Sequence, residues 1–183
     1  MKLVILDRDG VINEDSREFI KTPEEWRALP GSVEAIAELT AGGFTVAVAT
    51  NQSGLARGLL DETTLAAIHR KMISAVTAAG GRIDSIHYCP HGPGDNCDCR
   101  KPRAGLLREI AGRYNVDLHG VPAIGDSERD LEAARAVGAR PVLVLTGCGR
   151  ATLRALEGQR DLEVYDNLRA AARQLLTEHR RGA

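Results

Sequence analysis

The chain of 183 residues is 43% hydrophobic and 27% charged, and its 24 lysines and arginines nearly balance its 25 aspartates and glutamates. An aromatic content of 3% and the lack of a basic field argue against a nucleic-acid-binding surface, and no stretch approaches the roughly 20 apolar residues of a membrane span. The length suits one domain over residues 1–183, which we expect to be a monomer without nucleic-acid or membrane partners.

The chain opens with one lysine and a four-residue apolar run, followed by acidic residues, which is not the pattern of a secretory signal peptide. We therefore expect a cytoplasmic protein. In that reducing compartment the four cysteines are expected to be free thiols or metal ligands rather than disulfides.

Apolar runs and helical patterns alternate along the chain. The run over 44–50 is rich in β-branched residues without polar alternation, which fits a strand covered on both faces, and further strands are predicted over 3–6, 83–89, 121–126 and 141–146. The segments with helical periodicity predict helices over 32–39, 62–79, 105–114, 128–137 and 167–180. This alternation predicts an α/β fold, a doubly wound parallel sheet with helices on both faces.

Oxygen-bearing side chains follow three of the predicted strands. Asp7 and Asp9 come after the first strand, Thr50 and Asn51 end the second, and Asp126 ends the fourth. Because ligands of such sheets bind at the carboxyl ends of the strands, we expect these side chains to converge.

Clustered carboxylates repel one another unless a cation lies between them, and hard oxygen ligands favour Mg²⁺. The predicted magnesium ligands are Asp7, Asp126 and the main-chain carbonyl of Asp9. Thr50 and the N–H groups of the residues after it suit phosphoryl oxygens, which makes Asn51, Gln52 and Ser53 candidate substrate-binding residues. Arg100 and Lys101 supply the positive charge that phosphoryl transfer needs.

The motifs DRDGVIN, ATNQSG, CRKP and GDSERD, in this order, resemble the four motifs of the haloacid-dehalogenase-like (HAD) phosphatases, over essentially the whole chain. The resemblance implies that Asp7 attacks phosphorus to form a phospho-aspartate, that Asp9 is the general acid and base, and that Thr50 and Lys101 stabilise the phosphoryl group. For Asp130 we expect a capping or supporting role. Only 42 residues separate Asp7 from Thr50, which leaves no room for a large cap domain.

The loop over residues 89–99, CPHGPGDNCDC, carries four potential metal ligands in the order C-x-H-x5-C-x-C. This set matches a closed tetrahedral zinc site of structural type, with the ligands Cys89, His91, Cys97 and Cys99. His87 is an alternative nitrogen ligand, although its place in a strand favours a half-buried ring. For Cys148 and for the remaining histidines we expect no metal-binding role: His69, His119 and His179.

Within this superfamily, TNQSGLARG and CDCRKP resemble the D,D-heptose 1,7-bisphosphate phosphatases, which are close kin of the histidinol-phosphatases. The resemblance implies hydrolysis of the C7 phosphate of a heptose bisphosphate in making the heptose precursor of lipopolysaccharide. It also implies contacts with this small-molecule substrate from Arg100, Asp15 and Glu18. The stretch DSREFIKTPEEW departs from the DHGY-like stretch of other members, so the anomer preference stays open.

Two alternatives remain. A histidinol-phosphatase would use the same chemistry on a cationic leaving group. A phospho-acceptor signalling domain also gathers acids, a threonine and a lysine at the ends of a parallel sheet, but it stops at a stable phospho-aspartate. Asp9, two residues after the nucleophile, and the cysteine-rich loop both argue against signalling.

Overall fold

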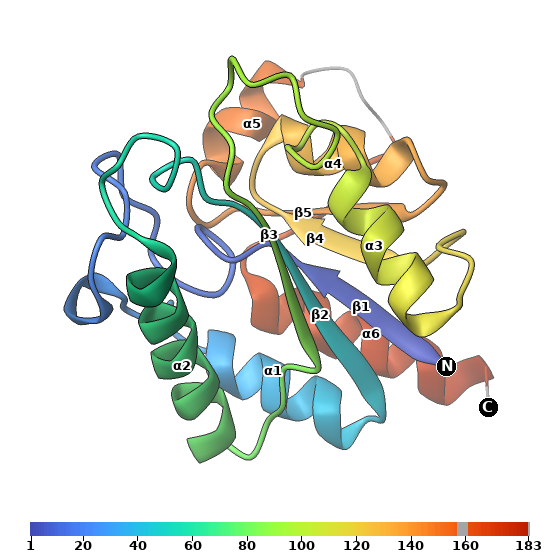
Figure 1. Cartoon of the computed structure of the whole chain (residues 1–183). Helices are drawn as coiled ribbons and strands as arrows, with labels where there is room; N and C mark the ends of the chain where they lie inside the picture. Colours follow the sequence, from blue (N-terminus) through green and yellow to red (C-terminus); the bar gives the residue numbers. More distant parts are fainter. Residues whose placement is uncertain (157–160, 183) are drawn as a thin grey trace.

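Six parallel strands form one sheet in the computed structural model, which describes residues 1–156 and 161–182 (Figure 1). The strands lie in the order β3-β2-β1-β4-β5-β6. Their bounds are β1 (Lys2–Leu6), β2 (Phe44–Asn51), β3 (Ser85–Cys89), β4 (Pro122–Gly125), β5 (Arg140–Val144) and β6 (Glu163–Tyr165). The strand order reverses direction between β1 and β4, which is where ligands bind in open sheets of this kind.

The helices cover both faces of the sheet, with α1, α2 and α6 on one side and α3, α4 and α5 on the other (Figure 1). Their bounds are α1 (Ser32–Ala41), α2 (Glu62–Ala78), α3 (Gly105–Tyr114), α4 (Glu128–Arg135), α5 (Gly149–Ala155) and α6 (Leu168–Gly182). The predicted doubly wound α/β fold is therefore confirmed.

The central strand β1 shows why its sequence is apolar throughout. Val4 and Leu6 pack with the helices on one face, and Leu3 and Ile5 pack with those on the other. Each full burial of such a side chain contributes about 1.5–3 kcal/mol. The alternation therefore fixes the register of β1, and with it the position of the residue that follows, Asp7.

Three elements were not predicted from the sequence: the 3-10 helix η1 (Pro23–Glu25), α5 and β6. Each is short, and β6 has only three residues, paired in parallel with β5. Such short elements carry little periodic signal and form because neighbouring elements hold them. The predicted helix over 128–137 ends earlier, at Arg135.

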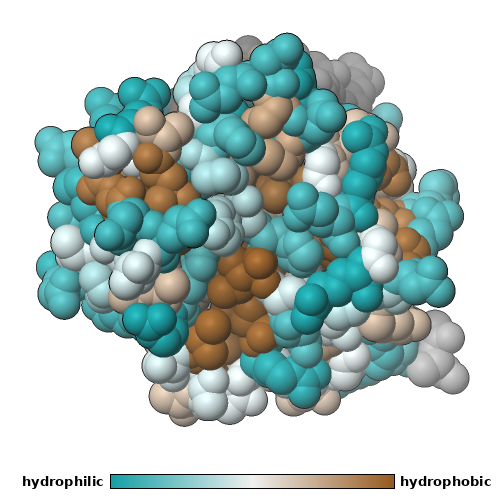
Figure 2. Space-filling model, viewed as in Figure 1, coloured by the Kyte–Doolittle hydropathy of each residue, from teal (hydrophilic) through white to brown (hydrophobic). Residues whose placement is uncertain are grey.

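The segment between β1 and α1 contains turns and η1, and no separate cap domain is present among the described residues. In that described part of the chain, no helix has both the length and the apolar character that crossing a bilayer demands. On the face shown in Figure 2, hydrophobic side chains form separate patches among hydrophilic ones.

Candidate active site

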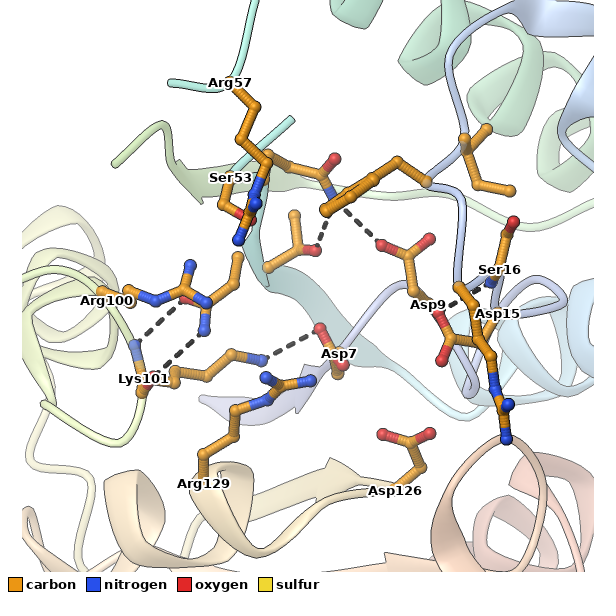
Figure 3. Close-up of a pocket in the computed structure, with 16 residues that line it drawn as sticks. Asp7, Asp9, Asp15, Ser16, Ser53, Arg57, Arg100, Lys101, Asp126 and Arg129 are labelled. Carbon is orange, nitrogen blue, oxygen red and sulfur yellow. Dashed lines mark hydrogen bonds and ion pairs between the residues drawn. The ribbon is translucent and has the colours of Figure 1, made fainter. Parts of the chain in front are cut away.

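A cavity of about 290 Å³ opens at the carboxyl ends of the central strands (Figure 3). It is lined by the five residues predicted to carry the chemistry: Asp7, Asp9, Thr50, Lys101 and Asp126. The structure thus brings together side chains that lie more than 100 residues apart in the sequence.

The ends of β1 and β4 place two carboxylates next to each other. The main-chain N–H of Asp7 donates to the carbonyl of Ile124 at 2.9 Å, which continues the pairing of the two strands as far as Asp7. Asp126 follows β4 directly. Gly10 and Gly147, both with positive φ, pack against the Asp126 carboxylate so closely that a Cβ on either would collide with it.

Lys101 is buried and makes three contacts through its Nζ. It lies 2.9 Å from Oδ1 of Asp7 and 2.5 Å from Oδ1 of Asp130, and it donates to the carbonyl of Ala49 at 2.8 Å. Burial alone would lower the pKa of Lys101, but the charges of Asp130 and Asp7 outweigh burial and raise it. The ammonium group therefore stays charged beside Asp7.

Asp130 also fulfils the capping role expected from the sequence. It forms a capping box with Ser127 at the start of α4, in which the Asp130 carboxylate accepts from the Ser127 main-chain N–H at 3.0 Å. Burial raises the pKa of Asp130, but Lys101 outweighs that effect and lowers it. Because Lys101 and Ser127 contact its two carboxylate oxygens, Asp130 is a less suitable metal ligand than Asp7 or Asp126.

Asp7 and Asp126 suit a divalent cation. One oxygen each of Asp7, Asp126 and Asp130 lies within 4.8 Å of the others. Burial, followed by the charge of Asp7, raises the pKa of Asp126 to about 8, and burial raises the pKa of Asp7 despite the opposing effect of Lys101. Such groups resist being ionised together without a cation, and their hard oxygens fit Mg²⁺.

Asp9 is held by three polar side chains. Arg8 donates to it through Nε at 3.1 Å and through Nη2 at 3.0 and 3.1 Å, Asn13 donates at 2.9 Å, and Gln52 donates at 3.0 Å. Gln52 also donates to Oγ1 of Thr50 at 2.9 Å. These contacts of Arg8 and Asn13 were not predicted, because nothing local in the sequence shows which carboxylate either side chain faces.

The candidate substrate-binding residues after Thr50 have other contacts than expected. The Asn51 side chain donates to the Lys101 carbonyl at 3.1 Å and accepts from the Lys101 N–H at 3.0 Å, so it fixes the loop that carries Lys101. The N–H of Gln52, expected to face phosphate, donates to the carbonyl of Cys89 at 2.8 Å. Ser53 lines the cavity as expected.

At the mouth of the cavity, Arg57, Arg100 and Arg129 direct their guanidinium groups toward its interior (Figure 3). Only Arg100 was predicted from the sequence, although Arg57 lies in the motif TNQSGLARG and Arg129 in the motif GDSERD. Asp15 lines the cavity, whereas Glu18 is exposed and is not part of its wall.

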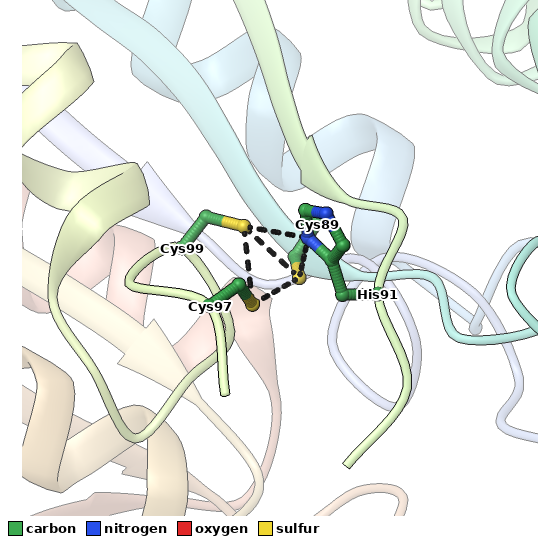
Figure 4. A group of neighbouring side chains, drawn as sticks. All are labelled: Cys89, His91, Cys97 and Cys99. Carbon is green, nitrogen blue, oxygen red and sulfur yellow. Dashed lines mark hydrogen bonds between the residues drawn. The ribbon is translucent and has the colours of Figure 1, made fainter. Parts of the chain in front are cut away.

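The loop over 89–99 brings its four candidate ligands together (Figure 4). Its sulfurs lie 3.2–3.6 Å apart, and Nδ1 of His91 lies 3.3 and 3.6 Å from the sulfurs of Cys99 and Cys89. A tetrahedral zinc site with Zn–S of about 2.3 Å has edges of about 3.8 Å between sulfurs and about 3.5 Å from sulfur to nitrogen, which is close to this arrangement.

His87, the alternative nitrogen ligand, lies outside this cluster. Its ring nitrogens face Glu109 and Ser85 at 3.3 and 3.2 Å, and the ring is half-buried, as its strand position indicated. The four-residue set of the loop is therefore complete without it.

Comparisons with known proteins agree with this geometry. A HAD-hydrolase-like family model matches residues 98–171, and a model of polynucleotide kinase 3 phosphatase matches residues 2–127. The chain is 58% identical to D-glycero-beta-D-manno-heptose-1,7-bisphosphate 7-phosphatase of Bordetella bronchiseptica, over 97% of this chain and 99% of that protein. It is 55% identical to the protein of the same name from Pseudomonas aeruginosa, over 95% of this chain and 97% of that protein.

Solved structures show the same likeness. The D,D-heptose 1,7-bisphosphate phosphatase of B. bronchiseptica, complexed with magnesium and phosphate, superposes with a TM-score of 0.95 over 97% of this chain and 99% of that one, at 58% identity. The enzyme of the same name from Burkholderia thailandensis gives 0.76 at 46% identity, over 97% and 99%. The chain therefore belongs to the D,D-heptose 1,7-bisphosphate phosphatase family of HAD-like hydrolases.

Proposed function

We propose that this protein is a magnesium-dependent phosphatase that hydrolyses the C7 phosphate of D-glycero-β-D-manno-heptose 1,7-bisphosphate. The observation that carries the proposal is the single cavity in which a carboxylate pair, a buried lysine and a set of arginines meet. The names of the relatives supply the sugar and its β-anomer.

The charge balance of the cavity supports a substrate with two phosphates. Five cationic side chains line it, namely Arg17, Arg57, Arg100, Lys101 and Arg129, against four carboxylates. With one Mg²⁺ bound, the wall would carry a net charge of about +3, which favours a polyanion. Guanidinium forks suit a second phosphate because they can bind it through two parallel hydrogen bonds.

The roles of the residues follow from their placement. A carboxylate oxygen of Asp7 attacks phosphorus, the bond from phosphorus to the C7 oxygen breaks, and Asp9 gives its proton to that oxygen. Asp9 then takes a proton from the water that hydrolyses the phospho-aspartate, which releases phosphate and restores Asp7. Lys101 and Thr50 bind the phosphoryl oxygens throughout.

Asp7, Asp126 and the main-chain carbonyl of Asp9 would hold Mg²⁺, which supplies charge neutralisation between the carboxylates and the phosphoryl group. Cys89, His91, Cys97 and Cys99 would hold a structural Zn²⁺. The zinc loop also positions the substrate contact, since Arg100 donates through Nη1 to the His91 carbonyl at 3.2 Å.

We further propose that the chain is one domain over residues 1–183, monomeric and cytoplasmic. Its product would supply the heptose precursor of lipopolysaccharide. Glu18 stays a candidate substrate contact, one that would require the segment around it to approach the cavity.

The test is phosphate release, in the presence of Mg²⁺, from both anomers of the heptose bisphosphate, histidinol phosphate and simple sugar phosphates. We expect continuous turnover with the highest kcat/KM on the β-anomer and a heptose 1-phosphate as product. A higher kcat/KM on histidinol phosphate would overturn the substrate assignment. A single turnover that ends in a stable phospho-protein would overturn the phosphatase assignment.

A further inference from the structure

Arg8 is a fully buried cation between the two aspartates of the DRDG motif. Its relative exposure is 0%, and each of its three hydrogen bonds goes to the carboxylate of Asp9. Taking a guanidinium group out of water costs several kcal/mol unless its partner is well placed. A fully buried arginine that pairs only with Asp9 therefore indicates that the fold holds that carboxylate in a defined position.

The two buried cations of the site divide the carboxylates between them. Lys101 contacts Asp7 and Asp130, and Arg8 contacts Asp9. The hydrogen bonds and the ion pair of the Arg8 side chain thus go to Asp9 and not to the proposed nucleophile. A change at Arg8 should act on proton transfer by Asp9 and leave the charge at Asp7 in place.

Asn13 and Gln52 complete the enclosure of Asp9 by donating to Oδ1 and Oδ2 respectively. Both oxygens are therefore bonded, and the carboxylate has little freedom to rotate away. The Asp9 side chain still lines the cavity, where the leaving oxygen must lie for proton transfer.

His69, on α2, adds no competing charge near Arg8. Its ring is buried, and burial together with the charge of Arg8 lowers the pKa of His69 to about 4, so the ring is neutral at neutral pH. His69 therefore does not repel the guanidinium group, which stays directed at Asp9.

We infer that Arg8 is a positioning residue for the general acid and base Asp9, an inference that rests on the proposed phosphatase function. In the first step Asp9 gives its proton to the C7 oxygen as the bond from that oxygen to phosphorus breaks. The planar fork of Arg8 stabilises the carboxylate that remains and holds it for the second step, in which it accepts a proton from water.

Two substrates that differ in their leaving group distinguish a positioning role of Arg8 from a purely structural one. An alkyl phosphate needs its leaving oxygen protonated, whereas p-nitrophenyl phosphate releases a stable nitrophenolate without a proton. In Arg8→Met we expect kcat on the heptose bisphosphate to fall about 10- to 100-fold, the scale of a misplaced catalytic group, with KM little changed. The initial burst of nitrophenol should keep its rate. An equal loss in both would overturn the inference.

A double-mutant comparison gives the second test. Once Asp9→Asn has removed the acid, adding Arg8→Met should cost almost nothing further, because both changes remove one function. Full additivity of the two losses would show that Arg8 acts by another route and overturn the inference. By contrast, an Asp9→Asn protein with full activity would contradict the proposed function itself, whatever Arg8 does.

Two variants guard against a folding effect. Arg8→Lys keeps the buried charge and lacks the planar fork of the guanidinium group. It should therefore fold and show the same dependence on the leaving group as Arg8→Met. If Arg8→Met does not fold, the kinetics of Arg8→Lys decide whether Arg8 is a positioning residue. Arg108→Met, on the exposed side of α3, is the matched control and should retain wild-type kinetics. A folded, fully active Arg8→Met would also overturn the inference, and so would wild-type kinetics in Arg8→Lys if Arg8→Met does not fold.

Discussion

At the scale of the residue, the site depends on how buried charges are paired. Asp7 and Asp126 lie at strand ends where water is scarce, and burial raises the pKa of each. Lys101 offsets part of this charge at Asp7, and Asp130 in turn holds Lys101. Asp7 and Asp130 thus share Lys101, whereas Asp9 pairs with Arg8 and Asp126 accepts from the Cys148 N–H. Substitutions of different acidic residues should therefore impair the protein in different ways.

Substitutions of the two aspartates of DRDG should impair different steps of the reaction. Asp7→Asn removes the proposed nucleophile and a metal ligand, so phosphate release should be abolished. Asp9→Asn keeps its main-chain carbonyl but loses proton transfer, which is worth about 100- to 10,000-fold. Steady-state phosphate release from the heptose bisphosphate measures both, and a fully active Asp7→Asn protein would rule out the mechanism.

Arg100 and Lys101 are adjacent, yet their contacts diverge: Lys101 reaches Asp7, while Arg100 lies at the cavity mouth and donates to the zinc loop. We expect Arg100→Ala to lower kcat/KM on the bisphosphate about 10- to 100-fold, the equivalent of a charge-assisted contact of about 1.5–3 kcal/mol. On a small monophosphate the loss should be much smaller.

Lys101→Ala should strongly lower turnover of both the bisphosphate and the monophosphate, because each of them presents the phosphoryl group that is transferred. Arg108→Ala, on the exposed side of α3, serves as the matched control. Equal losses for Arg100→Ala on the two substrates would mean that Arg100 serves the reacting phosphoryl group, and the bisphosphate assignment would lose local support.

At the scale of the element, the loop after β3 links the candidate zinc site to the candidate active site. Cys89 ends β3 and is buried, and the same loop runs on to Arg100 and Lys101. Asn51, at the end of β2, binds the main chain of Lys101 through two hydrogen bonds. Strand β2 and the zinc loop therefore set the position of the lysine together.

Zinc in this loop should be structural. Metal analysis of the purified protein should find about one zinc per chain. Cys97→Ser should lower the zinc content and the thermal stability, and it should increase hydrogen exchange over residues 89–101, because metal binding energy is folding energy in such sites. Cys148→Ser, a cysteine outside the cluster, is the control. Full stability and activity without zinc would refute the site.

At the scale of the whole molecule, one edge of the sheet collects the groups that cost most to bury. The strands β1, β2 and β4 supply the aspartates and Thr50, while the helices on both faces exclude water from the strands. The fold thus places unfavourable charges where a cation would stabilise them. Among the described residues, the large hydrophobic side chains that stay exposed are Met1, Leu59, Ile73 and Leu153.

Magnesium should therefore stabilise the fold, and more so at higher pH. The pKa of Asp126 is about 8 in the folded state and near its ordinary value of 3.8 when unfolded, so the metal-free folded state binds more protons between these values. Its stability should fall as pH rises through this window. Millimolar Mg²⁺ should raise Tm more at pH 8 than at pH 5, because the ligands must be deprotonated.

His69, whose pKa is lowered to about 4, contributes an opposite pH dependence of stability below pH 6.5. His69 is present in both the wild type and Asp126→Asn. The difference in stability between these two proteins at each pH therefore isolates the contribution of Asp126. Asp126→Asn should lose most of the response to Mg²⁺ as well as part of the pH dependence. Asp117→Asn, on the surface, should behave as the wild type. An Mg²⁺ response of Tm that is the same in all three proteins would contradict the assignment of Asp126.

The sequence by itself determined the fold class, because hydrophobic periodicity is a local property. The helix over 105–114 was predicted with the bounds that the structure shows, and the apolar runs located five of the six strands. It also located the candidate site, since the ends of parallel strands must lie at one edge of a sheet. The spacing of the four zinc-loop ligands within eleven residues was equally local.

Only the tertiary structure decided which side chains face one another. The contacts of Asn51 with Lys101, and of Gln52 with Asp9, join residues 50 and 43 positions apart, and no periodicity connects them. The approach of Arg57 and Arg129 to one cavity depends likewise on the docking of separate loops. Periodicity fixes which face of an element is buried, but the packing of several elements fixes the direction of each polar side chain, and that requires the whole fold.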